Sequence, residues 1–159
     1  MSFRIGIGYD VHRLDEGQEF ILGGIKIPFE KGPLGHSDGD VLIHAICDAL
    51  LGALALGDIG KHFPDTEEEF RDIDSKILLE KTINMIRFYG YEISNIDSTV
   101  CLQKPKISNY VPDMVKTLSN VLHIDEHLLS IKATTTEKLG FVGEEQGISA
   151  YAVVLLVLS

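Results

Sequence analysis

Short apolar runs near the start of the chain predict β-strands. Residues 3–9 are rich in apolar and β-branched side chains and stop at Asp10, which predicts a strand that ends there. The Gly23-Gly24 pair between two apolar arms predicts a hairpin over residues 20–27. The Lys-Gly-Pro cluster at residues 31–33 is expected to end this β unit.

Apolar residues recur with a helical period in three later segments. In residues 37–56 they repeat about every 3.6 positions, which predicts a long helix. After a polar loop over residues 58–71, a second amphipathic helix is predicted up to Gly90. A third helix is expected over residues 109–122.

Three further strands are predicted in the second half of the chain. Residues 92–102 alternate, with Ile96 and Val100 on one face, and residues 130–135 form a shorter strand. The apolar residues 147–158 predict a strand that is buried on both faces. Because the strands and the three helices do not strictly alternate, we predict a two-layer α/β sandwich: a mixed sheet with three main helices packed on one face.

Length and composition narrow the class of protein. The chain has 159 residues, of which 45% are hydrophobic and 24% charged, so we expect one globular domain over residues 1–159 and exclude a disordered chain. The longest apolar run, residues 150–158, is shorter than the ~20 residues that cross a bilayer. No signal-peptide pattern is evident, so a cytoplasmic location is expected. Cys47 and Cys101 lie in apolar segments without metal-binding spacing and are predicted to be buried thiols.

The charge balance is strongly acidic. The chain has 24 Asp and Glu residues against 14 Lys and Arg residues, which gives a formal net charge of −10. Such a charge disfavours sequence-independent binding to nucleic acid or to an anionic membrane surface. A phosphate-rich ligand would therefore need local interactions that overcome its electrostatic repulsion from the acidic chain.

One group of side chains has the composition of a metal site. Asp10 and His12 are two residues apart and therefore point to the same face of a strand. His44 lies in the first turns of the predicted helix, and it could complete a three-ligand zinc site with an open fourth position, as in catalytic zinc centres. Asp40 or Asp48, one turn away on either side, could orient the free ring nitrogen of His44. The alternative is an ordinary solvated Asp-x-His pair at a strand end.

Two other segments could hold anionic oxygens. Residues 35–40 form a glycine-punctuated turn that opens a helix, and its backbone amides could bind a phosphate. Alternatively, Ser37 or Asp38 simply caps the helix. Residues 133–141 contain three consecutive threonines followed by Glu137, which could form a capping box or a phosphate site with a carboxylate for Mg²⁺.

Taken together, four long motifs resemble those of the 2-C-methyl-D-erythritol 2,4-cyclodiphosphate synthase family, in the same order and over essentially the whole chain. They are GYDVH at residues 8–12, HSDGDVLIH at 36–44, GDIGKHFPD at 57–65 and KATTTEKLGF at 132–141. The resemblance implies an enzyme of the non-mevalonate route to isoprenoid precursors. It also implies a homotrimer with active sites between neighbouring subunits and a small-molecule cytidine diphosphate ester as substrate.

The resemblance further implies roles for individual residues. The divalent metal ligands would be Asp10, His12 and His44 for Zn²⁺ or a similar ion, and Glu137 for Mg²⁺ or Mn²⁺ at the diphosphate. His36 and Thr135 would be catalytic, by stabilising the transition state. The substrate-binding positions would be Ser37, Asp58, Ile59, Gly60, Phe63, Pro64, Asp65, Thr66, Glu67, Leu102, Lys104, Pro105, Lys106, Ser108, Thr134, Thr136, Phe141 and Glu144.

The implied reaction is an intramolecular phosphoryl transfer. The 2-phosphate attacks the β-phosphorus of the diphosphate, CMP leaves, and a cyclic diphosphate closes. Because a phosphate is already an anionic nucleophile, positioning and charge neutralisation would supply the catalysis. The alternatives are a metal-dependent phosphohydrolase and a non-catalytic trimer that binds nucleotides or metal.

One position departs from the family pattern. After Phe141-Val142-Gly143 the family usually has an Arg, and this chain has Glu144. In the family that Arg lies near the central cavity of the trimer, where an isoprenoid diphosphate can sit. We therefore expect Glu144 to repel such an anion in this chain.

Overall fold

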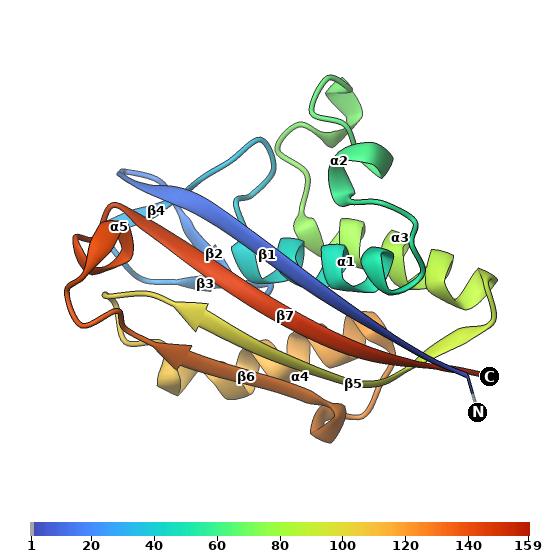
Figure 1. Cartoon of the computed structure of the whole chain (residues 1–159). Coiled ribbons are helices and arrows are strands. Elements are labelled where there is room, and N and C mark those ends of the chain that lie inside the picture. The colour runs from blue at the N-terminus through green and yellow to red at the C-terminus, as the bar shows by residue number, and fades with distance from the viewer. Residues whose placement is uncertain (1) are drawn as a thin grey trace.

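A five-stranded mixed sheet forms one layer of the molecule (Figure 1). The computed structural model describes residues 2–159. The strand order is β4-β1-β7-β5-β6; β5 and β6 run parallel, whereas the other neighbours are antiparallel. The strands are β1 (Phe3–Glu16), β4 (Lys31–Leu34), β5 (Tyr91–Cys101), β6 (Leu129–Thr134) and β7 (Gly147–Leu158).

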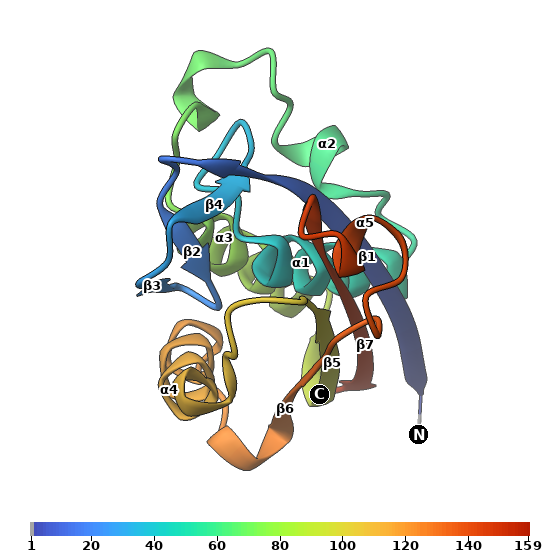
Figure 2. The ribbon, with the colours of Figure 1, turned by 90° about the vertical axis from the view of Figure 1, so that its left-hand side faces the viewer.

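Three helices cover one face of this sheet (Figure 2). They are α1 (Val41–Ala53), α3 (Ser75–Phe88) and α4 (Val111–Leu122). The apolar side of α1 packs on β1 and β7, α3 lies against α1, and α4 lies against β6. The buried side chains of these elements form one large core between the two layers. This arrangement confirms the predicted two-layer α/β sandwich.

The predicted hairpin is present and is attached to α1 by one carboxylate. It consists of β2 (Phe20–Leu22) and β3 (Ile25–Ile27), joined by Gly23 and Gly24 in the left-handed region. The fully buried carboxylate of Asp40 accepts hydrogen bonds from the backbone amides of Gly23 at 3.0 Å, Gly24 at 2.7 Å and Ile43 at 3.1 Å. Asp40 is therefore the N-cap of α1, and the prediction that Ser37 or Asp38 caps this helix is wrong.

The first strand is longer than its apolar pattern predicts. β1 does not end at Asp10 but continues to Glu16, because its second half pairs with β4. Residues 31–33, expected only to break the chain, belong to β4. Pro33 is tolerated there because β4 lies at the edge of the sheet, where a missing N–H removes no ladder hydrogen bond.

Helix bounds also differ from the predictions. α1 is shorter than the predicted 37–56, because its cap is Asp40 and it ends at Ala53. The segment expected to be a polar loop contains α2 (Ile59–His62) and a 3-10 turn over Glu68–Phe70. A short helix α5 (Gly140–Gly143) precedes β7.

The second face of the sheet is open and apolar. Along β7, Ala150, Ala152 and Val154 face the helices and are buried, whereas Tyr151 and Val153 are 46% and 43% exposed. Exposed side chains of β1 extend this open face; they are Phe3, Ile5, Ile7, Tyr9 and Val11. The expectation that residues 147–158 are buried on both faces is therefore wrong for the single chain.

The two cysteines differ in burial. Burial raises the pKa of the Cys47 thiol to about 12, as expected for an inert core thiol. Cys101 is only half-buried, so the prediction of a buried thiol holds for Cys47 and is wrong for Cys101. Within residues 2–159, no helix is long and apolar enough to cross a membrane.

Two glycines allow α1 to lie unusually close to β1. A Cβ atom added at Gly6 would lie 1.9 Å from the carbonyl oxygen of Ala49, and one at Gly8 would lie 1.8 Å from the carbonyl oxygen of Ala45. No side chain fits at such distances. Since alternate residues of a strand face the same side, Asp10 follows these glycines toward α1. The close approach of helix and strand thus brings their polar residues together.

We predict that Gly8→Ala forces α1 away from β1 and lowers the free energy of unfolding by about 3 kcal/mol, at the upper end of overpacking effects. Gly52→Ala is the matched control, because its new Cβ would meet only the Ile7 carbonyl oxygen, at 3.9 Å, within a helix. It should leave stability unchanged or raise it by up to about 1 kcal/mol. Urea unfolding measures both values, and equal losses in the two variants would contradict the packing argument.

Candidate active site

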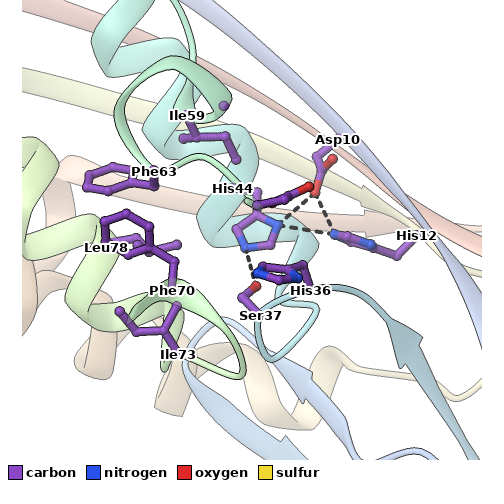
Figure 3. A pocket seen from close by; sticks show the side chains of 12 residues that line it. Asp10, His12, His36, Ser37, His44, Ile59, Phe63, Phe70, Ile73 and Leu78 are labelled. Carbon is purple, nitrogen blue, oxygen red and sulfur yellow. Dashed lines mark hydrogen bonds and ion pairs between the residues drawn. The ribbon is translucent and has the colours of Figure 1, made fainter. Parts of the chain in front are cut away.

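Three potential metal-ligand atoms from β1 and α1 converge on one point (Figure 3). Oδ2 of Asp10 lies 2.9 Å from Nε2 of His12 and 3.0 Å from Nδ1 of His44, and the two ring nitrogens are 3.1 Å apart. A triangle of this size allows one ion to stand about 2 Å from all three atoms, which is the usual zinc–ligand distance. These three residues are also the group of potential metal ligands that stands out within residues 2–159.

The hydrogen bonds around His12 favour a metal ligand over a solvated pair. Nδ1 of His12 lies 3.0 Å from the carbonyl oxygen of Leu34, which can only accept a hydrogen bond. In the neutral ring Nε2 therefore presents a lone pair toward Asp10. Such an arrangement, with the second nitrogen held by a carbonyl group, is typical of metal-binding histidines.

The electrostatics of the trio point to the same conclusion. Burial raises the pKa of Asp10, but its hydrogen bonds with His12 and His44 lower that pKa to about 2. Burial lowers the pKa of His12, but the hydrogen bond with Asp10 raises it above the usual value. The carboxylate thus stabilises a positive charge at this point, either a proton on His12 or a metal ion.

The second nitrogen of His44 contacts two serines. Its Nε2 lies 3.0 Å from Oγ of Ser37 and 3.0 Å from Oγ of Ser75. The prediction that Asp40 or Asp48 orients this nitrogen is wrong, because both carboxylates bind backbone amides instead: Asp40 holds the hairpin, and Asp48 accepts from the amide of Ile59 at 2.8 Å.

The three ligands lie at one end of a cavity of about 220 Å³. Figure 3 shows the polar residues at that end and a group of apolar side chains opposite them. The lining consists of Asp10, His12, His36, Ser37, His44, Ile59, Gly60, Phe63, Asp65, Phe70, Ile73 and Leu78. Within residues 2–159, the buried Nε2 of His36 has no hydrogen-bond partner, so it is available to a ligand in this cavity.

Two loops position the cavity walls. The backbone of His36 accepts from the amide of Asp72 at 2.9 Å, and the amide of Asp38 donates to Ile73, so the loop before α1 is tied to the start of α3. On the other side, Asp58 is the N-cap of α2 and accepts from the amide of Lys61 at 3.0 Å. Ile59 and Gly60 of α2 line the cavity, whereas Asp58 does not.

A second cavity, of about 260 Å³, lies at the end of β5 and β6. It contains several of the predicted substrate-binding positions together with Thr135; its lining is Leu102, Gln103, Pro105, Lys106, Ile107, Ser108, Ala133, Thr134 and Thr135. The peptide bond between Lys104 and Pro105 is cis. Since β7 and β5 separate β1 from β6, the two cavities lie apart within one chain.

The remaining predicted residues are placed as follows. Glu137 is exposed in a turn with a left-handed backbone and does not belong to the group formed by Asp10, His12 and His44. Thr136 donates to the carbonyl oxygen of Leu139 at 2.7 Å, so the threonine segment forms a turn and not a capping box. Lys104 forms an ion pair with Glu145 at 3.3 Å, and Glu144 is exposed beside it.

Several predicted contact positions lie outside the first cavity. Thr66 lines a neighbouring hollow with His36, and Asp65 lines both this hollow and the first cavity. Pro64 and Glu67 line neither hollow. Phe141 packs beside Gly147 near the start of β7.

Three lining residues of the first cavity and one buried neighbour of His44, four in all, were not predicted from the sequence. Three of them are the apolar Phe70, Ile73 and Leu78, which pack with Phe63 in a small separate core. Their helical spacing and their position in or after a polar loop gave no sign of a cavity wall. The fourth is Ser75, a buried serine at the start of α3, a place where serine is common for local reasons.

Comparison with known proteins assigns this site to a family. The YgbB family matches residues 3–157, nearly the whole chain. The chain belongs to the YgbB family.

Curated YgbB relatives carry one common name. The 2-C-methyl-D-erythritol 2,4-cyclodiphosphate synthase of Parabacteroides distasonis is 60% identical over 156 residues, covering 98% of this chain and 97% of that protein. The synthase of the same name from Bacteroides fragilis is 58% identical, covering 98% of both chains.

Solved structures agree in fold. A 2C-methyl-D-erythritol-2,4-cyclodiphosphate synthase, 37% identical, superimposes with a TM-score of 0.90 over 97% of this chain and 100% of that one. The IspF–CDP complex from Plasmodium falciparum is 42% identical and gives a TM-score of 0.87, covering 99% of this chain and 97% of that one. The bifunctional IspDF from Campylobacter jejuni is 40% identical and gives a TM-score of 0.95. That comparison covers 99% of this chain but only 43% of the longer protein.

We predict that His44→Ala abolishes stoichiometric binding of a divalent ion while the fold remains, because two ligands cannot replace three and the core lies on the other sides of α1. Mass spectrometry of the metal content tests the loss of binding, and circular dichroism tests whether the fold remains. His127→Ala, at an exposed position, is the control and should keep its metal. Loss of folded structure in His44→Ala would show that the histidine serves the core.

Proposed function

We propose that this chain is a cyclising lyase, the activity for which its curated relatives are named. It would convert 4-diphosphocytidyl-2-C-methyl-D-erythritol 2-phosphate to 2-C-methyl-D-erythritol 2,4-cyclodiphosphate and CMP. The observation that carries the proposal is the convergence of Asp10, His12 and His44 at one end of a cavity where a buried nitrogen of His36 stays unpaired within residues 2–159. We expect the reaction to take place in the cytoplasm.

The reaction requires two phosphate groups to meet in spite of their charge. An oxygen of the 2-phosphate forms a bond to the β-phosphorus, and the bond from that phosphorus to the oxygen of CMP breaks, so that CMP leaves with the electron pair. A divalent ion held by Asp10, His12 and His44 would supply charge neutralisation at the attacked phosphate. We propose Zn²⁺ for this site because two imidazoles and one carboxylate are typical zinc ligands.

Other residues of the first cavity would hold and orient the substrate. His36 can donate from Nε2 to a phosphate oxygen, and the Ser37 hydroxyl lies beside it at the same end. The apolar wall formed by Phe63, Phe70 and Leu78 would cover the methylerythritol part.

The second cavity would hold the cytidine, with Thr135 and Glu137 acting at the diphosphate. Glu137 is exposed, and its carboxylate is free to bind Mg²⁺ or Mn²⁺, the oxygen-binding ions suited to a diphosphate. Because the two cavities lie apart in one chain, we propose that a neighbouring subunit brings its second cavity to the first one. The open apolar face of the sheet would form the contact in a homotrimer.

Isotope labelling separates the proposed reaction from a phosphohydrolase. We expect purified protein with substrate and Mg²⁺ in ¹⁸O-labelled water to yield CMP and an unlabelled cyclic diphosphate, identified by phosphorus NMR and mass spectrometry. Internal attack takes no oxygen from water, whereas hydrolysis must incorporate one. Labelled product would establish the phosphohydrolase, and binding without CMP release would establish a non-catalytic nucleotide-binding protein. His44→Ala serves as the inactive control.

We expect Val153→Asp to dissociate the trimer, since it places a charge in the centre of the open apolar face. The control is Phe88→Asp, at an 86% exposed position on α3, on the opposite side of the molecule. This variant should remain trimeric. Sedimentation velocity gives the masses, and a trimeric Val153→Asp would exclude this face as the interface.

A further inference from the structure

Ser75 is a buried polar residue that the proposed reaction does not use. It is the first residue of α3 and is fully buried. Its Oγ lies 2.5 Å from Oδ1 of Asp38 and 3.0 Å from Nε2 of His44. Its backbone amide donates to Oδ2 of the same carboxylate at 2.9 Å. Ser75 therefore links an acidic side chain of the loop before α1 to a metal-ligating histidine.

The direction of these hydrogen bonds follows from counting protons. Each oxygen of Asp38 already faces a backbone N–H, from Asp40 at 3.1 Å and from Ser75, so the carboxylate acts as an acceptor. A serine hydroxyl has a single proton, and the short contact with Asp38 uses it. Oγ of Ser75 must then accept from Nε2 of His44. In the neutral ring the hydrogen is on Nε2, and Nδ1 presents its lone pair to Asp10.

Ser37 contacts the same nitrogen but cannot impose this direction. Its Oγ lies 3.0 Å from Nε2 of His44 and 3.5 Å from Oγ of Ser75, and neither contact commits its proton. The hydroxyl of Ser37 can therefore accept from Nε2 or donate to it. If Ser37 donates to Nε2, the hydrogen of His44 moves to Nδ1. There it would bind Asp10 and occupy the position of the metal ion.

We propose that Ser75, held by Asp38, is a positioning residue that fixes His44 in the tautomer with a bare Nδ1 and so keeps all three ligand atoms ready for a metal ion. This role rests on the proposed function through its metal site. It also defines what Ser37 can do. Since Ser75 accepts the hydrogen of His44, the hydroxyl of Ser37 is free to donate to a phosphate oxygen in the cavity.

The two serines supply a matched pair for the test. In the metal-free protein, nitrogen-15 NMR of labelled histidine should show His44 as the Nε2–H tautomer in the wild type and in Ser37→Ala, and as a mixture in Ser75→Ala. Binding of Zn²⁺ to the stripped protein should weaken about 10- to 100-fold in Ser75→Ala, the usual effect of losing a hydrogen-bond partner of a metal ligand. In Ser37→Ala it should stay within about threefold of the wild type.

A third variant serves as the control for the general effect of removing a buried serine hydroxyl on stability and Zn²⁺ affinity. Ser119 is equally buried, but its hydroxyl donates only to carbonyl oxygens of its own helix, at 2.6 and 3.2 Å. Ser119→Ala should lower Tm by an amount comparable to that for Ser75→Ala and leave Zn²⁺ affinity unchanged. An unaltered tautomer and affinity in Ser75→Ala would overturn the positioning role alone. A wild-type protein that binds no Zn²⁺ would overturn the proposed metal site as well.

Discussion

The close contact between α1 and β1 is the constraint on which the rest of the site depends. The oxygen of Asp10 and the ring nitrogens of His12 and His44 form a triangle with sides of 2.9 to 3.1 Å, so a shift of one ångström between helix and strand would break it. Gly6 and Gly8 remove the side chains that would otherwise separate the two backbones. These glycines lower the strand propensity of β1, and the packing of the buried apolar side chains of α1 offsets that cost.

The local sequence pattern identified those site residues whose relative placement is set by a single strand or helix. The spacing of Asp10 and His12 follows from the two-residue period of a strand, and this period holds although the strand is longer than predicted. Pairing between distant segments was not visible in the pattern: β4 extends β1 beyond Asp10, and its proline and glycine resemble a simple chain break. The fold class could be predicted from the sequence, because that prediction requires only the types of helices and strands and their order along the chain.

The partners of His44 show a different limit of sequence reasoning. Helical periodicity favours neighbours one turn away, which suggested Asp40 and Asp48, but both carboxylates satisfy backbone amides. The real partner, Ser75, is 31 residues away in the sequence and reaches His44 only because α3 packs against α1. Asp40 and Asp48 thus serve as acceptors that hold the backbone around the site and do not contact the second nitrogen of His44.

Pro33 in β4 has a consequence for how these molecules can assemble. An exposed sheet edge is a template for further strands, and it is the usual starting point for runaway aggregation. β4 is short, and Pro33 removes one of the few amide donors that a foreign strand would need. A foreign strand would therefore find few backbone donors at this edge of the sheet. The broad apolar face differs from such an edge, because contacts through a face can close into a small particle of fixed size.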